Sequence, residues 1–69
     1  MFDRKDLELV SRAYREGKAE GGLDDAYRRA SSALLGRHPE LGTLGEDALT
    51  LRVAQVISTA VITGHLPRS

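Results

Sequence analysis

Residues 53–64 read VAQVISTAVITG, and the conformation of this stretch decides the fold. It contains five Val and Ile residues and no charged side chain. A half-buried strand would alternate apolar and polar residues, whereas Val56-Ile57 and Val61-Ile62 are adjacent apolar pairs. The uncharged run is also shorter than the roughly 20 apolar residues that span a membrane. The pattern therefore predicts a helix held by tertiary burial.

The residues before this stretch predict where the helix begins. Thr43 and Glu46 have the spacing of a capping box, with Thr43 as N-cap. From Leu49 onward, apolar residues recur at intervals of three and four, as on one face of a helix. Gly64 and Pro67 follow as stop signals. We therefore predict a helix over residues 44–63.

Two further helices are predicted upstream, at residues 3–20 and 23–35. Asp3 can cap the first, and Gly21-Gly22 separates the two. Asp24 and Asp25 lie in the first turn of the second helix and four residues before Arg28 and Arg29. Gly36 is the expected C-terminal glycine, and a loop is expected from residue 36 to residue 42.

The predicted architecture is an all-α three-helix bundle comprising one domain, residues 1–69. Its third helix is the most apolar and is expected to be central. Leu23 is also placed on the apolar stripe of the second helix. The expected core consists of Leu7, Val10, Tyr14, Tyr27, Ala30, Leu34, Leu49, Val53, Val56, Ile57, Ala60 and Val61.

Composition limits the classes of function. Ten Lys and Arg balance ten Asp and Glu, so no overall field attracts nucleic acid or an anionic membrane. The chain has no Cys, which removes disulfides and thiolate metal ligands and fits a reducing compartment. The first residues contain no continuous apolar segment of the secretory type. We expect a cytoplasmic protein without a membrane anchor.

Motifs of catalysis and metal binding are missing from the sequence. There is no nucleophile elbow, zinc-protease motif or phosphate-binding loop. His38 and His65 lack the partners and spacing of a zinc site. Asp24-Asp25 and Glu46-Asp47 are paired carboxylates that helix starts explain. We therefore predict no enzyme activity, no cofactor and no metal.

An arginine cluster leaves nucleic-acid binding as the alternative hypothesis. A few exposed arginines can neutralise phosphates, although Arg28 and Arg29 can equally pair with Asp24 and Asp25. The connection between the second and third helices is longer than the turn of a helix-turn-helix motif. The candidate contacts are Arg28, Arg29, Arg37, His38 and Arg52.

Protein binding is the leading functional hypothesis. The third helix carries a second apolar line of Leu44, Leu51 and Ile62, away from its expected core face. Such a line marks an interface unless residues 36–42, with Leu41, fold over it. We expect a homodimer that acts as a small regulatory protein and also binds another protein. An accessory subunit or an inhibitor of the bacterial or phage type would fit.

Overall fold

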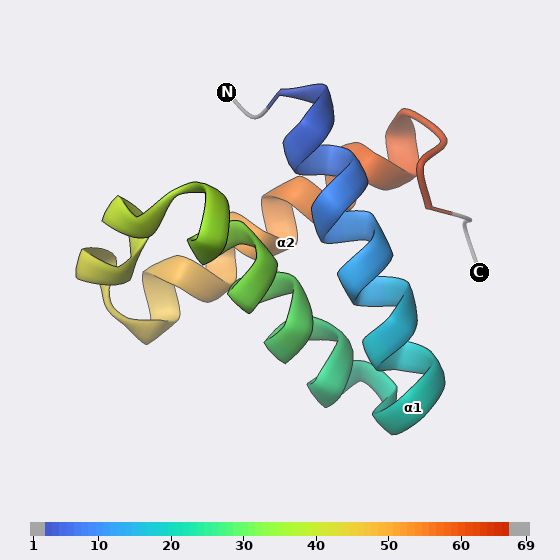
Figure 1. Cartoon of the computed structure of the whole chain (residues 1–69), viewed down its shortest axis with the longest axis horizontal. Coiled ribbons are helices and arrows are strands. Elements are labelled where there is room, and N and C mark those ends of the chain that lie inside the picture. Colours follow the sequence, from blue (N-terminus) through green and yellow to red (C-terminus); the bar gives the residue numbers. More distant parts are fainter. Residues whose placement is uncertain (1–2, 67–69) are drawn as a thin grey trace.

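The computed structural model describes residues 3–66 and is entirely helical in its regular structure. The elements are α1 (Arg4–Arg37), the 3₁₀ helix η1 (Pro39–Leu44) and α2 (Glu46–Ile62) (Figure 1). The predicted all-α class is confirmed. Within the described range, no helix has the length and apolar character needed to cross a bilayer.

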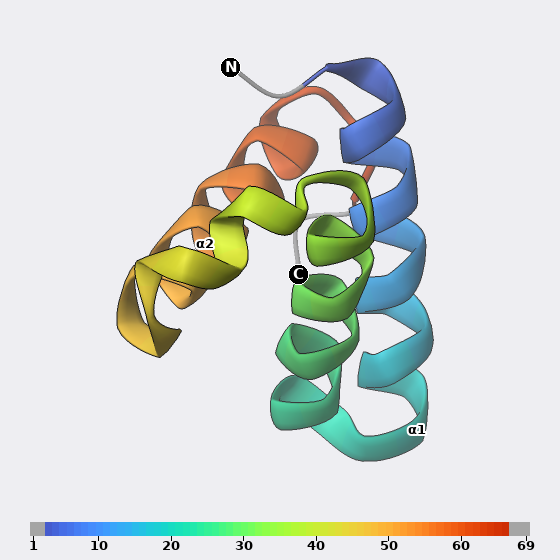
Figure 2. The same ribbon diagram turned by 60° about the vertical axis from the view of Figure 1, so that its left-hand side comes forward.

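Helix α1 is a hairpin of two arms that meet at Gly22. Gly22 has φ 80° and ψ −160°, a backbone conformation that is essentially restricted to glycine. The chain reverses there, so the arms before and after Gly22 lie side by side (Figures 1 and 2). These arms are the first two predicted helices. The second continues through Arg37, two residues beyond its predicted end at residue 35, and His38, restricted by Pro39, is the C-cap. Most of the predicted loop over residues 36–42 is therefore helical, as the end of α1 and the start of η1.

Small residues allow the two arms to approach closely near the turn. Gly17 is buried, and a Cβ placed on it would lie 2.5 Å from the carbonyl oxygen of Asp25 and 2.7 Å from Cα of Ala26. Beside the close contact at Gly17, the rings of Tyr14 and Tyr27 meet edge to face, with centroids 5.8 Å apart. Backbone contact and an aromatic pair therefore hold the hairpin together.

Helix α2 crosses one face of the hairpin, and the core lies between them (Figure 2). All twelve predicted core residues belong to this core or pack against it at partial burial. Leu23 does not, because 57% of it is exposed beside the hairpin turn. The buried cluster consists of Leu7, Val10, Ala30, Leu34, Val53, Val56, Ile57, Ala60 and Leu66.

The start of α2 differs from the prediction. Thr43 belongs to η1, where its hydroxyl donates to the carbonyl of Glu40 at 2.8 Å. Gly45, with φ 89°, is the N-cap and provides no side-chain hydrogen bond. Thr43 is therefore not the N-cap of α2, because the 3₁₀ helix that follows Pro39 uses its hydroxyl locally.

The end of α2 turns back onto the core. Gly64 has φ 88°, and the amides of His65 and Leu66 donate to the carbonyl of Ala60 at 2.8 and 3.1 Å. This turn buries Leu66 to 4% exposure. A glycine-terminated helix end commonly makes such an apolar contact, and Leu66 is therefore a core residue outside the predicted set.

Ser11 is a buried polar residue without a hydrogen-bond partner among residues 3–66. Ser11 is 2% exposed, and its hydroxyl makes no hydrogen bond. Replacing Ser11 with alanine removes this unsatisfied group and raises helix propensity, so we expect the free energy of unfolding to rise by roughly 1 kcal/mol. Urea denaturation followed by circular dichroism measures the change. A clear loss of stability would show that the hydroxyl is satisfied in solution.

Candidate functional site

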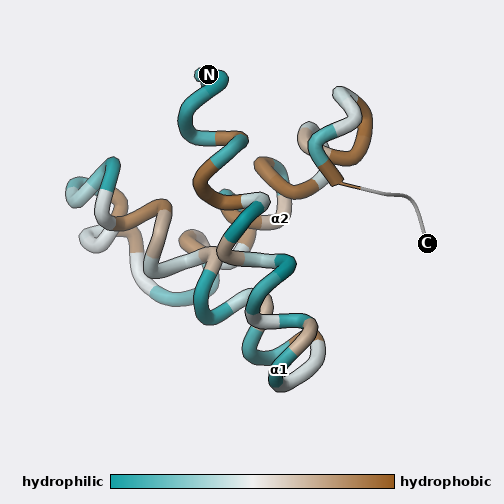
Figure 3. The backbone as a smooth tube through the Cα atoms, turned by 45° about the vertical axis from the view of Figure 1, so that its right-hand side comes forward, coloured by the Kyte–Doolittle hydropathy of each residue, from teal (hydrophilic) through white to brown (hydrophobic). Residues whose placement is uncertain are grey.

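The side of α2 that faces away from the core carries exposed apolar residues. Leu51 is 61% exposed and Ile62 is 74% exposed. They lie eleven positions apart, which places them within about 20° of each other around the helix. We define the outer face of α2 as its exposed residues Leu51, Arg52, Gln55, Ser58, Thr59 and Ile62. Figure 3 shows that apolar residues are frequent along α2, whereas α1 carries most of the strongly hydrophilic ones.

Two threonine hydroxyls on and beside the outer face are satisfied within the helix. The hydroxyl of Thr59 donates to the carbonyl of Gln55, and that of Thr63 donates to the carbonyl of Thr59, each at 2.9 Å. Such bonds reduce the need of the hydroxyls for water. Arg52 is the only charged residue on this face. The surface is therefore less costly to dehydrate than the charged surface of α1.

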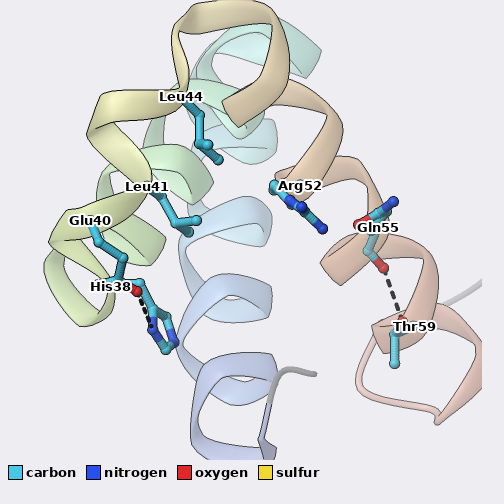
Figure 4. Close-up of a pocket in the computed structure, with 7 residues that line it drawn as sticks. All are labelled: His38, Glu40, Leu41, Leu44, Arg52, Gln55 and Thr59. Carbon is cyan, nitrogen blue, oxygen red and sulfur yellow. Dashed lines mark hydrogen bonds and ion pairs between the residues drawn. The ribbon is translucent and has the colours of Figure 1, made fainter.

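A cleft of about 700 Å³ adjoins the outer face, between η1 and α2 (Figure 4). Leu41 and Leu44 project into it from η1 and face Arg52 and Gln55 on α2. Leu41 is partly buried against the core, whereas Leu44 remains 43% exposed. The folding back of Leu41 thus leaves Leu44, Leu51 and Ile62 uncovered. The lining residues are His38, Glu40, Leu41, Leu44, Arg52, Gln55 and Thr59.

Two residues that line this cleft, His38 and Glu40, belong to a polar network centred on Asp6. Asp6 is 1% exposed and accepts hydrogen bonds from Nε of Arg37 at 2.8 Å and from the backbone amide of Asp3 at 3.2 Å. The Nε2 atom of His38 lies 2.9 Å from Asp6, and its Nδ1 atom lies 3.3 Å from Glu40. Asp3 is the N-cap of α1, as predicted, and Asp6 completes a capping box with it. The network ties the start of α1 to the junction between α1 and η1.

The network shifts the protonation of its members. Burial alone would raise the pKa of Asp6, but the hydrogen bonds from Arg37 and His38 reverse that effect and lower it to about 2. The hydrogen bond to Asp6 raises the pKa of His38, and the charge of Glu40 adds to the increase. The same carboxylate raises the pKa of Arg37. Asp6 is thus a buried carboxylate between the guanidinium of Arg37 and the imidazole of His38.

The five predicted nucleic-acid contacts do not form one cluster. Arg28 pairs with Asp25 at 3.6 Å, and Arg29 pairs with Glu20 at 2.6 Å across the turn of the hairpin. Arg28 therefore pairs with one of the two expected aspartates, at a spacing of three rather than four, whereas the expected pair of Arg29 with an aspartate is wrong.

The remaining three contacts lie near η1. Arg37 pairs with Asp6 at 2.8 Å and with Asp3 at 3.4 Å. His38 and Arg52 are the two members that line the same cleft. Arg52 makes no ion pair with any residue from 3 to 66.

Asp6 was missed by the sequence analysis. The available signal was its spacing of three from the N-cap Asp3, together with its place next to the buried Leu7. That spacing predicts a cap, but only the tertiary structure brings Arg37 and His38 to the same carboxylate. In the described part of the chain, no three His, Cys, Asp or Glu side chains are grouped as metal ligands would be.

Comparisons with known proteins provide no relative. No protein-family model matches this chain, and neither the curated proteins nor the solved structures include a match. The geometry of α2 and the adjoining cleft is therefore the basis for the functional argument.

Proposed function

We propose that this chain is a non-enzymatic, cytoplasmic protein-interaction module that self-associates through the outer face of α2 and also binds another protein as a regulator. The observation that carries the proposal is the exposure of Leu51 and Ile62 on one face of a helix whose opposite face forms the core. Large apolar side chains exposed along one helix face are a feature of interaction sites, and symmetric dimers are the commonest assemblies.

The alternative, binding to nucleic acid, has less support from the geometry. Arg28, Arg29 and Arg37 each contact a carboxylate, which competes with phosphate for the guanidinium group. A cluster built for phosphate would leave its cations unpaired. Retention on heparin at low salt would favour this alternative, and its absence would remove it.

Sedimentation of Leu51→Glu tests the proposed interface. We expect the wild type to form dimers at high micromolar concentration and the variant to remain monomeric while keeping its helical circular-dichroism spectrum, because the new charge would be dehydrated only in the dimer. Leu23→Glu is the matched control, since Leu23 is 57% exposed but lies on α1. This control should still dimerise. A wild type that remains monomeric throughout would contradict the proposal.

A further inference from the structure

Four residues of the outer face of α2, together with the partly buried Ala48, fall at the a and d positions of a heptad. Leu51 and Ile62 are the large apolar residues among them, whereas Gln55 and Ser58 are polar. Ala48, Leu51, Gln55, Ser58 and Ile62 follow one another at intervals of three, four, three and four. These intervals correspond to alternating a and d positions of a heptad repeat, with a at 48, 55 and 62 and d at 51 and 58. The buried residues Val53, Val56, Ile57 and Ala60 occupy the other side of the helix. One helix thus presents a core stripe and, roughly opposite, an unpartnered heptad stripe.

The charges beside this seam are complementary between two copies of the chain. In this heptad frame, Asp47 is a g residue and Arg52 is the following e residue. Both are exposed, and neither makes an ion pair within the described residues. In a parallel pair of helices, a g residue lies beside the next e residue of the partner, where opposite charges attract. Two-fold symmetry would form this pair twice.

An antiparallel pair would lose this complementarity. In that orientation e residues face e residues and g residues face g residues, so the remaining e and g residues become the partners. The other e residue is Thr59, and the other g residues are Ala54 and Val61. None of these can pair with the charge of Arg52 or Asp47. Gln55 adds a further preference, because a polar residue at an a position favours an arrangement in which it meets its own copy.

We infer that the partner of the outer face is a second copy of this chain, with the two α2 helices parallel and Asp47 of each paired with Arg52 of the other. This inference rests on the proposed self-association and specifies its geometry. It also accounts for the unpaired Arg52 at the edge of the cleft, because the second copy would bring a carboxylate to it. Leu51 would meet Leu51, and Ile62 would meet Ile62, across the two-fold axis.

Single cysteines test the orientation, because the natural chain contains none. Ala48→Cys and Ser58→Cys place a thiol at an a and at a d position. In a parallel dimer each thiol meets its own copy, so both variants should form disulfide-linked dimers under mild oxidation. In a symmetric antiparallel dimer, the distance along the helix axis from residue 48 to its own copy and the distance from residue 58 to its own copy would add up to at least about 30 Å. At most one of the two variants could therefore reach the Cα separation of about 4.4–6.8 Å that a disulfide requires.

The possible outcomes separate the orientation from the self-association. Efficient cross-linking of both single variants, with little for Glu16→Cys on the exposed surface of α1, supports the parallel pair. Faster cross-linking in a mixture of Ala48→Cys and Ser58→Cys than in either alone overturns it in favour of the antiparallel pair, while self-association stands. A wild type that sediments as a monomer at every concentration overturns both.

Charge reversal provides a second measurement on the same interface. Arg52→Asp should raise the dimer dissociation constant roughly tenfold, because two attractions become two repulsions. Asp47→Arg in the same chain should restore most of the affinity, since the reversed pair is again attractive. If the double variant binds no better than Arg52→Asp alone, the Asp47–Arg52 pairing is wrong.

Discussion

Gly17→Ala is expected to destabilise the protein severely. A Cβ at this position would lie 2.5 Å from the carbonyl oxygen of Asp25 and 2.7 Å from Cα of Ala26. Both are backbone atoms, so no side-chain rotation relieves the contact and the two arms of α1 must separate. Overpacking of this kind costs about 1 to 3 kcal/mol, or more where the backbone resists. We expect a loss at the upper end of that range.

Such a loss is large for a chain of 69 residues, whose total stability is expected to be roughly 3 to 10 kcal/mol. Gly36→Ala is the matched control, because it makes the same substitution in the second arm of α1, where the new Cβ would meet no other side chain or segment within 4 Å. It should be neutral or raise stability by up to about 1 kcal/mol through helix propensity. Chemical denaturation compares the two. Equal stability of both variants would show that the arms are not in backbone contact at Gly17.

Asp6→Asn is expected to have the second largest effect. The pKa of Asp6 falls from its ordinary value of 3.8 to about 2 in the folded protein. A group with a lowered pKa stabilises the fold above its unfolded-state value, and that stability disappears as pH falls toward the folded-state value. The difference corresponds to roughly 2 kcal/mol. We therefore expect Asp6→Asn to lose about this amount near pH 5.

The same network predicts how stability varies with pH. The part of the free energy of unfolding that Asp6 contributes should be lost as pH falls from 3.8 toward 2. The pKa of His38 is raised above 6.5, so its contribution is present below 6.5 and is lost as pH rises through the folded-state value. Stability from this network is therefore greatest between about pH 4 and pH 6.5.

Denaturation at a series of pH values measures both limbs. Asp6→Asn should flatten the acid limb, and His38→Gln should flatten the limb above pH 6.5. Asp24→Asn is the control, because Asp24 is exposed and forms no ion pair in the described structure; its change should stay within about 0.5 kcal/mol. If Asp6→Asn matches the wild type in acid and near pH 5, the buried carboxylate does not contribute as the geometry indicates.

The candidate site could be predicted only in part. The heptad-like line of Leu51 and Ile62 follows from spacing alone, because both residues belong to one helix and a helix has a fixed period. Leu44 precedes the helix break at Gly45, so its position beside the cleft depends on the path of η1. The ion-pair partners of Arg37 and Arg29 likewise could not be predicted from neighbouring residues. Arg37 pairs with a carboxylate 31 positions away, and Arg29 pairs with Glu20 across the hairpin turn.

By itself, the sequence determined the three main helical segments, the break between the first two at Gly21-Gly22 and the division of each segment into a buried and an exposed face. These properties depend on backbone preferences and on periodicity, which act over a few residues. Only the tertiary structure decided the close contact at Gly17, the burial of Leu66 and the meeting of Asp6 with Arg37 and His38. Each depends on how near two distant segments come, and that distance is set by the packing of the whole chain, for which no local pattern codes.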